Sequence, residues 1–253
     1  MSFESLRSYS DHILRRLTGR SFKLDAVPDV PEGDRRTIKT VERFTMASPE
    51  RLHAVCEAVR YVENSSISGD IVECGVWRGG SMMAAALTLL SLGSTERQFF
   101  LFDTFEGMSP PDQHDISLDG ERASDLGELH EKNESDRFWC YAPLDAVKKA
   151  VFSTGYPSEK FHFLKGRVEE TLPISAPEKI AILRLDTDWY ESTRHELETL
   201  YPRLVRGGVL ILDDYGHWQG ARKAVDEYIG KHNLKLFLSR TDYTGRVAVK
   251  AFE

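Results

Sequence analysis

The sequence has little cysteine, no long apolar run and no excess of positive charge, and each shortage narrows the class of protein. Three cysteines, Cys56, Cys74 and Cys140, occur in 253 residues. An odd and scattered set does not suit a disulfide framework, and it favours a reducing cytoplasm. The formal net charge of −7 argues against a general nucleic-acid binder, which needs a basic face.

Apolar residues are spread along the chain rather than gathered in one segment. No stretch approaches membrane-spanning length, and the N-terminus has no signal-peptide core. We therefore expect a cytoplasmic protein without a membrane partner. Internal repeats and low-complexity segments are also missing from the sequence. With 41% apolar and 29% charged residues, the composition is ordinary for a globular enzyme, and the length suits one large α/β domain.

A glycine-rich turn between a short apolar run and a small-residue helix is the most informative stretch. Residues 71–73 predict a buried strand that ends in an acid, residues 75–80 contain three glycines, and residues 81–90 predict a helix. Glycine lets the backbone approach a ligand, and a helix start offers N–H groups to an anion. The pattern is typical of a nucleotide-type site at the carboxyl end of a parallel strand. It departs from the fingerprint G-x-G-x-x-G because Val76 and Trp77 occupy its middle.

Strands and helices alternate after this turn. We expect further strands at residues 98–103, 160–165, 179–186 and 209–214, helices at 142–152, 191–204 and 218–229, and two short terminal strands at 234–239 and 246–252. Residues 166–170 predict a turn, the glycines at 207–208 should close the helix before them, and Gly230 should cap the last helix. Five βα units and a C-terminal antiparallel hairpin describe a seven-stranded, mostly parallel α/β sheet. Class I methyltransferases and dehydrogenases both have such Rossmann-like folds.

The pattern of residues 1–65 indicates an N-terminal helical cap ahead of the main domain at 66–253. An amphipathic helix is expected at 4–18, and the prolines and polar residues of 25–37 predict an extended loop. Ser48 is placed as a helix N-cap, because a proline and an acid follow it. We expect the cap to serve packing or contact between copies of a homo-oligomer rather than substrate binding.

Residues 106–140 form an insertion of a different character. The segment has two adjacent prolines, a run of acids and few large apolar side chains. It is too long for an ordinary connection between a strand and a helix. Long loops at the ligand end of such sheets usually close over a substrate, so we predict a lid. A disordered acidic surface loop is the alternative.

Acidic residues end three of the expected strands. Asp103 ends the second, where nucleotide-binding folds place an acid that accepts hydrogen bonds from ribose, although a solvated carboxylate is the alternative. Asp186 ends the fourth strand, and Asp213 and Asp214 end the fifth. Neighbouring strands would bring these three carboxylates together, and they would repel one another without a cation. Oxygen-only ligands favour Mg²⁺, whereas each acid taken alone equally suits a helix cap or a loop.

Four stretches of the sequence together form a specific pattern: residues 70–81 (DIVECGVWRGGS), 101–107 (LFDTFEG), 183–190 (LRLDTDWY) and 201–215 (YPRLVRGGVLILDDY). In these stretches the sequence resembles the macrocin O-methyltransferase (TylF/MycF) family of S-adenosylmethionine-dependent sugar O-methyltransferases. The resemblance implies a class I methyltransferase fold, with S-adenosylmethionine and Mg²⁺ as cofactors. It implies that the cofactor is bound by Thr45, Met46, Glu73, Gly75, Ser81, Asp103, Gly166, Arg167 and Val168. It also implies that Mg²⁺ is bound by Asp186, Asp213 and Asp214, with Asp186 as the general base.

The acceptor and the remaining roles stay open at this point. Members of the family methylate deoxysugars attached to macrolide or coumarin-type antibiotics, but the N-terminal segment and residues 108–140 depart from them, so nucleotide- and polysaccharide-linked sugars are alternatives. His217 is a candidate auxiliary base, a substrate hydrogen-bonding group or a helix-start contact. Trp189 and Tyr190 suit either sugar stacking or the core.

Two other classes of function are weighed against methyl transfer. A NAD-type oxidoreductase needs the fingerprint glycine that is missing here, and it leaves three acids unexplained. A non-catalytic sugar- or metal-binding module needs no cofactor turn.

Overall fold

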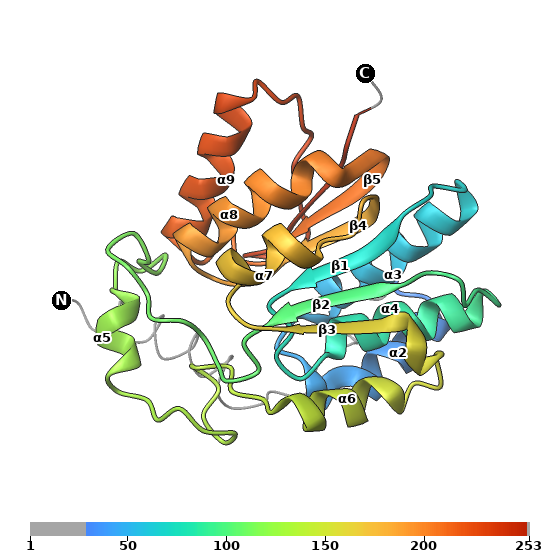
Figure 1. The fold of residues 1–253 in the computed structure, drawn as a ribbon, viewed down its shortest axis with the longest axis horizontal. Coiled ribbons are helices and arrows are strands. Elements are labelled where there is room, and N and C mark those ends of the chain that lie inside the picture. The colour runs from blue at the N-terminus through green and yellow to red at the C-terminus, as the bar shows by residue number, and fades with distance from the viewer. Residues whose placement is uncertain (1–28, 252–253) are drawn as a thin grey trace.

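The computed structural model describes residues 29–251, and the helix expected at 4–18 lies outside this range. Its centre is a seven-stranded sheet with the strand order β3-β2-β1-β4-β5-β7-β6 (Figure 1). The first five strands run parallel to one another, and β7 runs antiparallel to both β5 and β6. The predicted seven-stranded, mostly parallel α/β sheet with a C-terminal antiparallel hairpin is confirmed.

The strands are short, and most of them end where an acid or a glycine begins a loop. They are β1 (Asp70–Cys74), β2 (Phe99–Asp103), β3 (Phe161–Lys165), β4 (Ile180–Leu185), β5 (Leu204–Leu212), β6 (Ser239–Arg240) and β7 (Arg246–Val249). All six residues of β4 are buried, because helices cover both faces of the sheet at this central strand.

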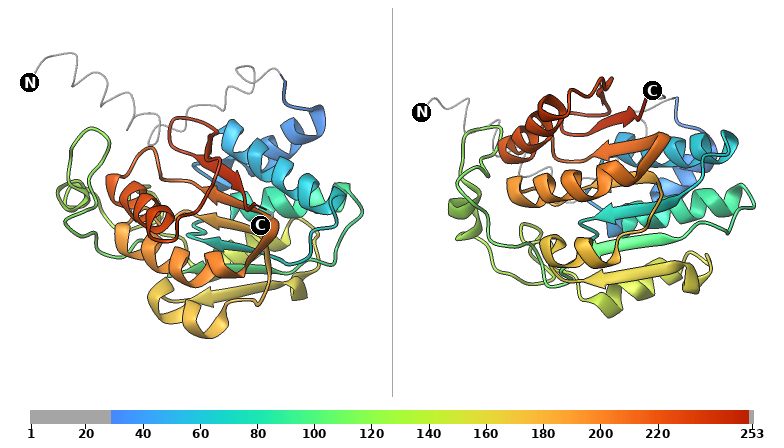
Figure 2. Two further views of the ribbon diagram at one scale, coloured as in Figure 1. Left: turned by 90° about the horizontal axis from the view of Figure 1, so that it is seen from above. Right: turned by 45° about the horizontal axis from the view of Figure 1, so that its top comes forward.

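The helices form two layers around the sheet. In the described residues they are α2 (Glu32–Val41), α3 (Pro49–Asn64), α4 (Gly80–Ser91), α5 (Ala123–Gly127), α6 (Leu144–Phe152), α7 (Val168–Ser175), α8 (Tyr190–Leu200) and α9 (Gln219–Lys231), with the 3-10 turns η2 (Glu42–Phe44), η3 (Ser158–Lys160) and η4 (Tyr201–Arg203). Helices α2, α3, α4 and α6 cover one face, and α7, α8 and α9 cover the other (Figures 1 and 2). The sheet and its helical layers make one continuous α/β body in this part of the chain.

Helix α3 begins as its sequence predicts. The hydroxyl oxygen of Ser48 accepts a hydrogen bond of 3.2 Å from the backbone N–H of Arg51, and Pro49 occupies the first turn, where a missing N–H costs nothing. The apolar stripe of the helix is buried: Leu52, Val55, Cys56, Val59 and Val62. This burial ties the helix to α4 and to the sheet.

The extended loop expected at 25–37 is wrong from residue 32 onward. Residues Glu32–Val41 form α2 instead, and Pro31 is its N-cap residue. The proline ends the preceding turn rather than breaking a helix, because a helix tolerates proline at its start. The buried Ile38 and Val41 then anchor α2 on the core.

Several boundaries in the second half also differ from the prediction. The strand expected at 234–239 is only the two-residue β6, Ser239–Arg240. The turn expected at 166–170 leads directly into α7, which begins at Val168. Helix α8 ends at Leu200 rather than near residue 204, and the glycines at 207–208 lie inside β5. A Cβ at Gly208 would lie 3.1 Å from the carbonyl oxygen of Ala181, so this glycine permits close strand pairing and does not cap a helix. Helix α9 runs one residue past Gly230 and has His232 as its C-cap.

The insertion at residues 106–140 lies beyond the carboxyl ends of the strands and carries α5 (Figure 2). The role of this insertion as a lid stays a prediction. The N-terminal cap at residues 1–65 and the homo-oligomer also stay predictions. Among the described residues, no helix is both long enough and apolar enough to span a membrane.

Candidate active site

A cavity lies at the carboxyl ends of the parallel strands. Ten of the residues predicted to bind cofactor or metal line it: Thr45, Met46, Gly75, Ser81, Asp103, Gly166, Arg167, Val168, Asp186 and Asp213. Three others, Glu73, Asp214 and His217, are not among the lining residues. The cavity therefore brings together segments from five connections, those that follow β1, β2, β3, β4 and β5, and from the loop before α3.

The glycine-rich turn needs its glycines mainly for contacts within the protein. Gly75 has a φ of 80°, and a Cβ there would overlap the backbone carbonyl group of Asp186. A Cβ at Gly80 would lie 2.7 Å from the carbonyl oxygen of Phe44. The turn is thus pressed between the loop after β4 and the loop before α3, and both of those loops line the cavity.

Asp103 organises the two loops beside it. Its Oδ2 accepts hydrogen bonds from the N–H groups of Val76 at 2.7 Å and Trp77 at 2.9 Å. Its Oδ1 accepts a hydrogen bond from the N–H of Phe105 at 2.7 Å. Burial raises the pKa of Asp103, although these backbone hydrogen bonds oppose that rise. The carboxylate fixes the walls of the cavity, and its predicted contact with ribose stays a prediction.

Glu73 is buried beneath the cavity and faces an arginine. Its Oε1 lies 2.6 Å from Nη1 of Arg184, which stands beside it in the sheet register. The same Nη1 lies 2.8 Å from Asp186 Oδ2, and Nη2 donates to Asp213 Oδ1 at 2.6 Å. Arg184 is therefore shared by three carboxylates from neighbouring strands.

The carboxylates predicted to converge do converge. Asp186, Asp213 and Asp214 each offer an oxygen atom, and these atoms all lie within 4.8 Å of one another. They meet because β4 and β5 are paired in parallel, so both carboxyl ends reach the same edge of the sheet. Whether the cluster binds a metal ion stays a prediction.

The three acids differ in how their charge is compensated. Burial raises the pKa of Asp214, and Asp188, Asp186 and Asp213 raise it further by repulsion. Burial also raises the pKa of Asp186, with Arg184 only partly opposing the rise. Burial has the same effect on Asp213, but the nearby arginines outweigh it and the pKa of Asp213 falls below its ordinary value. Only Asp213 has its charge compensated by arginines strongly enough to lower its pKa.

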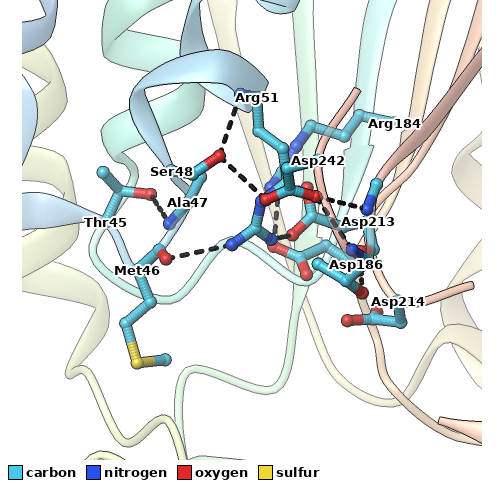
Figure 3. Close-up of polar contacts among 12 residues, drawn as sticks. Thr45, Met46, Ala47, Ser48, Arg51, Arg184, Asp186, Asp213, Asp214 and Asp242 are labelled. Atoms are coloured by element: carbon cyan, nitrogen blue, oxygen red, sulfur yellow. Dashed lines mark hydrogen bonds and ion pairs between the residues drawn. The ribbon is translucent and has the colours of Figure 1, made fainter. Parts of the chain in front are cut away.

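Arg51 approaches the cluster from α3. It forms an ion pair with Asp213, and its Nε lies 3.0 Å from Asp242 Oδ2 (Figure 3). Its Nη2 donates to the carbonyl oxygen of Met46 at 3.1 Å. One side chain therefore links the acids after β5, the turn between β6 and β7, and the loop that precedes α3.

Asp188 adds a fourth carboxylate, which the sequence reasoning missed. It lines the cavity and is 5% exposed. Its φ of 65° is uncommon for a residue with a side chain, and its N–H donates to Asp214 Oδ2 at 3.0 Å. The spacing of two residues from Asp186 was the available signal, because both follow the same strand.

The sequence profile of the macrocin O-methyltransferase (TylF) family matches residues 16–250. The chain belongs to this family. The predicted family and enzyme class are confirmed, and the chain is an O-methyltransferase. The NAD-type oxidoreductase and the non-catalytic module are therefore set aside.

Named relatives of this chain come from Streptomyces and Micromonospora species. The 8-demethyl-8-(2,3-dimethoxy-alpha-L-rhamnosyl)-tetracenomycin-C 4'-O-methyltransferase of Streptomyces olivaceus is 36% identical over 201 residues, which are 79% of this chain and 73% of that protein. Mycinamicin III 3''-O-methyltransferase of Micromonospora griseorubida is 31% identical over 201 residues, which are 79% of this chain and 76% of that one.

Solved structures agree with the family assignment. The O-methyltransferase NovP has a TM-score of 0.71 at 30% identity, with 83% of each chain covered. A calicheamicin methyltransferase has a TM-score of 0.60 at 18% identity, with 86% of this chain and 91% of that chain covered. The second likeness bears on the fold alone. The predicted class I methyltransferase fold is confirmed.

Other predicted residues of the macrocin O-methyltransferase family member lie next to the cavity rather than in it. The N–H of His217 donates to the carbonyl oxygen of Asp214 at 2.9 Å, and its ring lies edge-on to Trp218. Trp189 is buried, and its ring centroid lies 5.0 Å from that of Trp218. Trp189 therefore belongs to a small core cluster rather than to an exposed stacking surface.

The insertion is docked on the starts of α8 and α9. Ser109 accepts a hydrogen bond from Trp189 Nε1 at 2.8 Å, and Asp115 Oδ1 accepts one from the N–H of Tyr190 at 2.8 Å. Ser117 pairs with Trp218 in an isolated bridge. Residues on both sides of these contacts line the cavity, among them Met108, Ser109 and Cys140. Opening and closing of this segment stays a prediction.

Proposed function

We propose that this O-methyltransferase transfers the methyl group of S-adenosylmethionine to a hydroxyl group of a sugar in a reaction that depends on Mg²⁺. The observation that carries the proposal is one cavity lined by both the glycine-rich turn and the acids Asp186 and Asp213. The relatives from Streptomyces olivaceus and Micromonospora griseorubida are named for methylating a rhamnosyl-tetracenomycin and mycinamicin III. Their names support a sugar-bearing natural product as the acceptor class.

The residues around the turn fit S-adenosylmethionine. The cavity is lined by the turn after β1, by Asp103 and by the turn after β3, which are the places where a nucleoside cofactor is expected in such a sheet. Helix α4 begins at Gly80, and Ser81 lines the cavity, so the N–H groups of this helix start suit the cofactor carboxylate. Asp103 accepts three backbone N–H groups, and the remaining position on Oδ1 has only a long contact of 3.5 Å with Thr104 Oγ1, which a ribose hydroxyl would replace.

The carboxylate cluster fits a hard divalent ion. Asp186, Asp213 and Asp214 supply oxygen atoms within 4.8 Å of one another, and oxygen-only ligands suit Mg²⁺. When ionised, the three carboxylates outnumber the two arginines that contact the cluster, Arg51 and Arg184, and this supports a further cation there. An ion held by these residues would make a coordinated sugar hydroxyl more acidic and orient it.

The chain's own residues then align the acceptor and take its proton. The bond between the methyl carbon and sulfur breaks as the bond between that carbon and the hydroxyl oxygen forms, so correct alignment supplies most of the catalysis. The hydroxyl proton passes to a carboxylate in the cavity. We propose Asp186 for this step, with Asp188 as the second candidate because it also lines the cavity. His217 is a weaker candidate, because it does not line the cavity.

We expect the part of the cavity lining that comes from the insertion to determine which acceptor the enzyme binds. Met108, Ser109 and Cys140 line the cavity and come from or border the insertion at residues 106–140. A deoxysugar of a natural product is the proposed acceptor, and sugars linked to a nucleotide or a polysaccharide are the alternatives.

Two measurements test this proposal. In calorimetry, S-adenosylmethionine and S-adenosylhomocysteine should bind with saturation, whereas NAD⁺ should not bind. In a transfer assay against free, nucleotide-linked and natural-product sugars, at least one glycosylated natural product should gain a methyl group. Binding of NAD⁺ without a response to S-adenosylhomocysteine would refute the proposed donor.

A further inference from the structure

Both carboxylate oxygens of Asp213 are already bound by guanidinium groups. Oδ1 accepts a hydrogen bond of 2.6 Å from Arg184 Nη2, and Oδ2 forms an ion pair with Arg51 Nη1 (Figure 3). An ion that uses Asp186, Asp213 and Asp214 as ligands needs one oxygen of Asp213. One of the two arginines must therefore either move away from Asp213 or share an Asp213 oxygen with the ion.

Arg184 is held too firmly to be the one that moves. Its side chain is 3% exposed, and it also contacts Glu73 at 2.6 Å and Asp186 at 2.8 Å. Removing it from Asp213 would leave buried charges without compensation, which costs several kcal/mol.

Arg51 can move away from Asp213 while its positive charge stays compensated by other groups. Its side chain is 13% exposed and lines the cavity. It already has two further partners, Asp242 Oδ2 at 3.0 Å from Nε and the carbonyl oxygen of Met46 at 3.1 Å from Nη2. A guanidinium that leaves Asp213 therefore keeps one carboxylate and one carbonyl oxygen.

We propose that Arg51 is a resident counter-cation of the carboxylate cluster, which a divalent ion displaces from Asp213 onto Asp242 and Met46. The inference rests on the metal site of the proposed function and goes beyond it, because it assigns a positioning role to a residue outside the ligand set. The physical reason is that two like charges a few ångström apart repel strongly in a cavity of low dielectric constant.

The displacement also reaches the cofactor side of the cavity. Met46 belongs to the loop of Thr45–Ala47, whose residues line the cavity. Ser48 caps α3 and donates to Asp242 Oδ2 at 2.8 Å, so the partner that receives Arg51 is tied to the start of the same helix. Movement of Arg51 therefore changes contacts of the loop that the cofactor is proposed to touch.

Isothermal titration of the full chain with Mg²⁺, without cofactor or acceptor, tests the proposal. The Arg51→Met variant should bind the ion at least about tenfold more tightly than the wild type, because a competing positive charge is gone. The matched control is Arg194→Met on α8, whose guanidinium pairs with Glu191 and Glu198 at the surface and lies outside the carboxylate cluster. This control should bind the ion within about twofold of the wild type, because distant sites act independently.

A crystal structure of the wild-type protein with Mn²⁺ gives a second answer that needs no variant to fold. Arg51 should then contact Asp242 and Met46 but no longer Asp213. Equal or weaker Mg²⁺ binding by Arg51→Met, or an Arg51 that stays on Asp213 Oδ2 beside a bound ion, overturns this proposal and leaves the proposed function intact. Absence of saturable Mg²⁺ binding by the wild type overturns both.

Discussion

Arg184 Nη1 lies 2.6 Å from Glu73 Oε1, and this buried ion pair joins β4 to β1 beneath the cavity. The same guanidinium contacts Asp186 and Asp213, so one cation orders carboxylates on three neighbouring segments. Burial raises the pKa of Glu73 to about 8, and Arg184 opposes that rise. The arrangement of the acids at the cavity therefore depends on a residue that only partly faces it.

Replacing Arg184 by methionine should destabilise the protein strongly. The substitution leaves buried carboxylates without their cation, which costs about 3–5 kcal/mol. Urea denaturation measures the loss. The control is Arg194→Met, because Arg194 is 40% exposed and makes only surface pairs with Glu191 and Glu198, worth about 0–1 kcal/mol. A loss for Arg184→Met as small as that of the control would contradict the structural role of the pair.

Replacing Gly75 by alanine should disrupt the turn beside the cavity. The new Cβ would overlap the backbone of Asp186, and the φ of 80° is unfavourable for alanine. Gly93 is a matched control, since its φ is 71° and its Cβ would meet nothing within 4 Å. The Gly93→Ala change should cost about 1–2 kcal/mol from backbone strain alone.

The Gly75→Ala change should cost clearly more than this control and should also weaken binding of S-adenosylhomocysteine. Denaturation and calorimetry on the two variants decide the matter. Equal losses of stability, with cofactor binding intact in both, would show that the close approach to Asp186 is unimportant.

The docking of the insertion should respond to pH through Asp115. Burial raises the pKa of Asp115 from 3.8 to about 6. A carboxyl group whose pKa is higher in the folded state stabilises the fold when protonated, and this contribution is lost as the pH rises from about 4 to about 6. Each pKa unit corresponds to about 1.4 kcal/mol, so the loss is on the order of 1–3 kcal/mol.

The Asp115→Asn variant removes this titration and keeps an oxygen for the N–H of Tyr190. Unfolding free energies of both proteins should be measured between pH 4 and pH 7. Relative to the variant, the wild type should become less stable as the pH rises through this window. A constant difference would exclude Asp115 as the titrating group.

The sheet and the meeting of the acids could be predicted because both follow from local patterns. Strand ends are marked by apolar runs that stop at an acid, and parallel neighbours necessarily share an edge. That reasoning placed Asp186, Asp213 and Asp214 together, as the structure has them. The cap of α3 was equally local, since Ser48 needs only the next three residues to act.

The arginines of the site could not be placed by such patterns. Arg51 is 162 residues from Asp213, and on its own helix it has the position of an ordinary solvated side chain. Arg184 did carry a signal, because a lone charge within an apolar strand must be buried and paired. Its partners depend on the register between β1, β4 and β5, which the sequence does not reveal.

Misplaced boundaries had a common cause. The sequence pattern at Pro31 and at the glycines 207–208 predicts a loop and a helix end. The effect of these residues depends on what packs against them. Pro31 begins α2, and Gly208 lets β5 approach Ala181 closely. Local propensity identifies such prolines and glycines as special positions. It does not tell whether a residue begins or ends a helix, or whether a glycine caps a helix or allows a close contact between strands.

The most direct test of the proposed function is methyl transfer to a glycosylated natural product before and after removal of divalent ions. Enzyme treated with a chelator should lose transfer by roughly a hundredfold or more, and added Mg²⁺ should restore it, because acid–base assistance to the hydroxyl typically contributes about 10²–10⁴ to the rate. Full activity after chelation would contradict the role assigned to Asp186, Asp213 and Asp214.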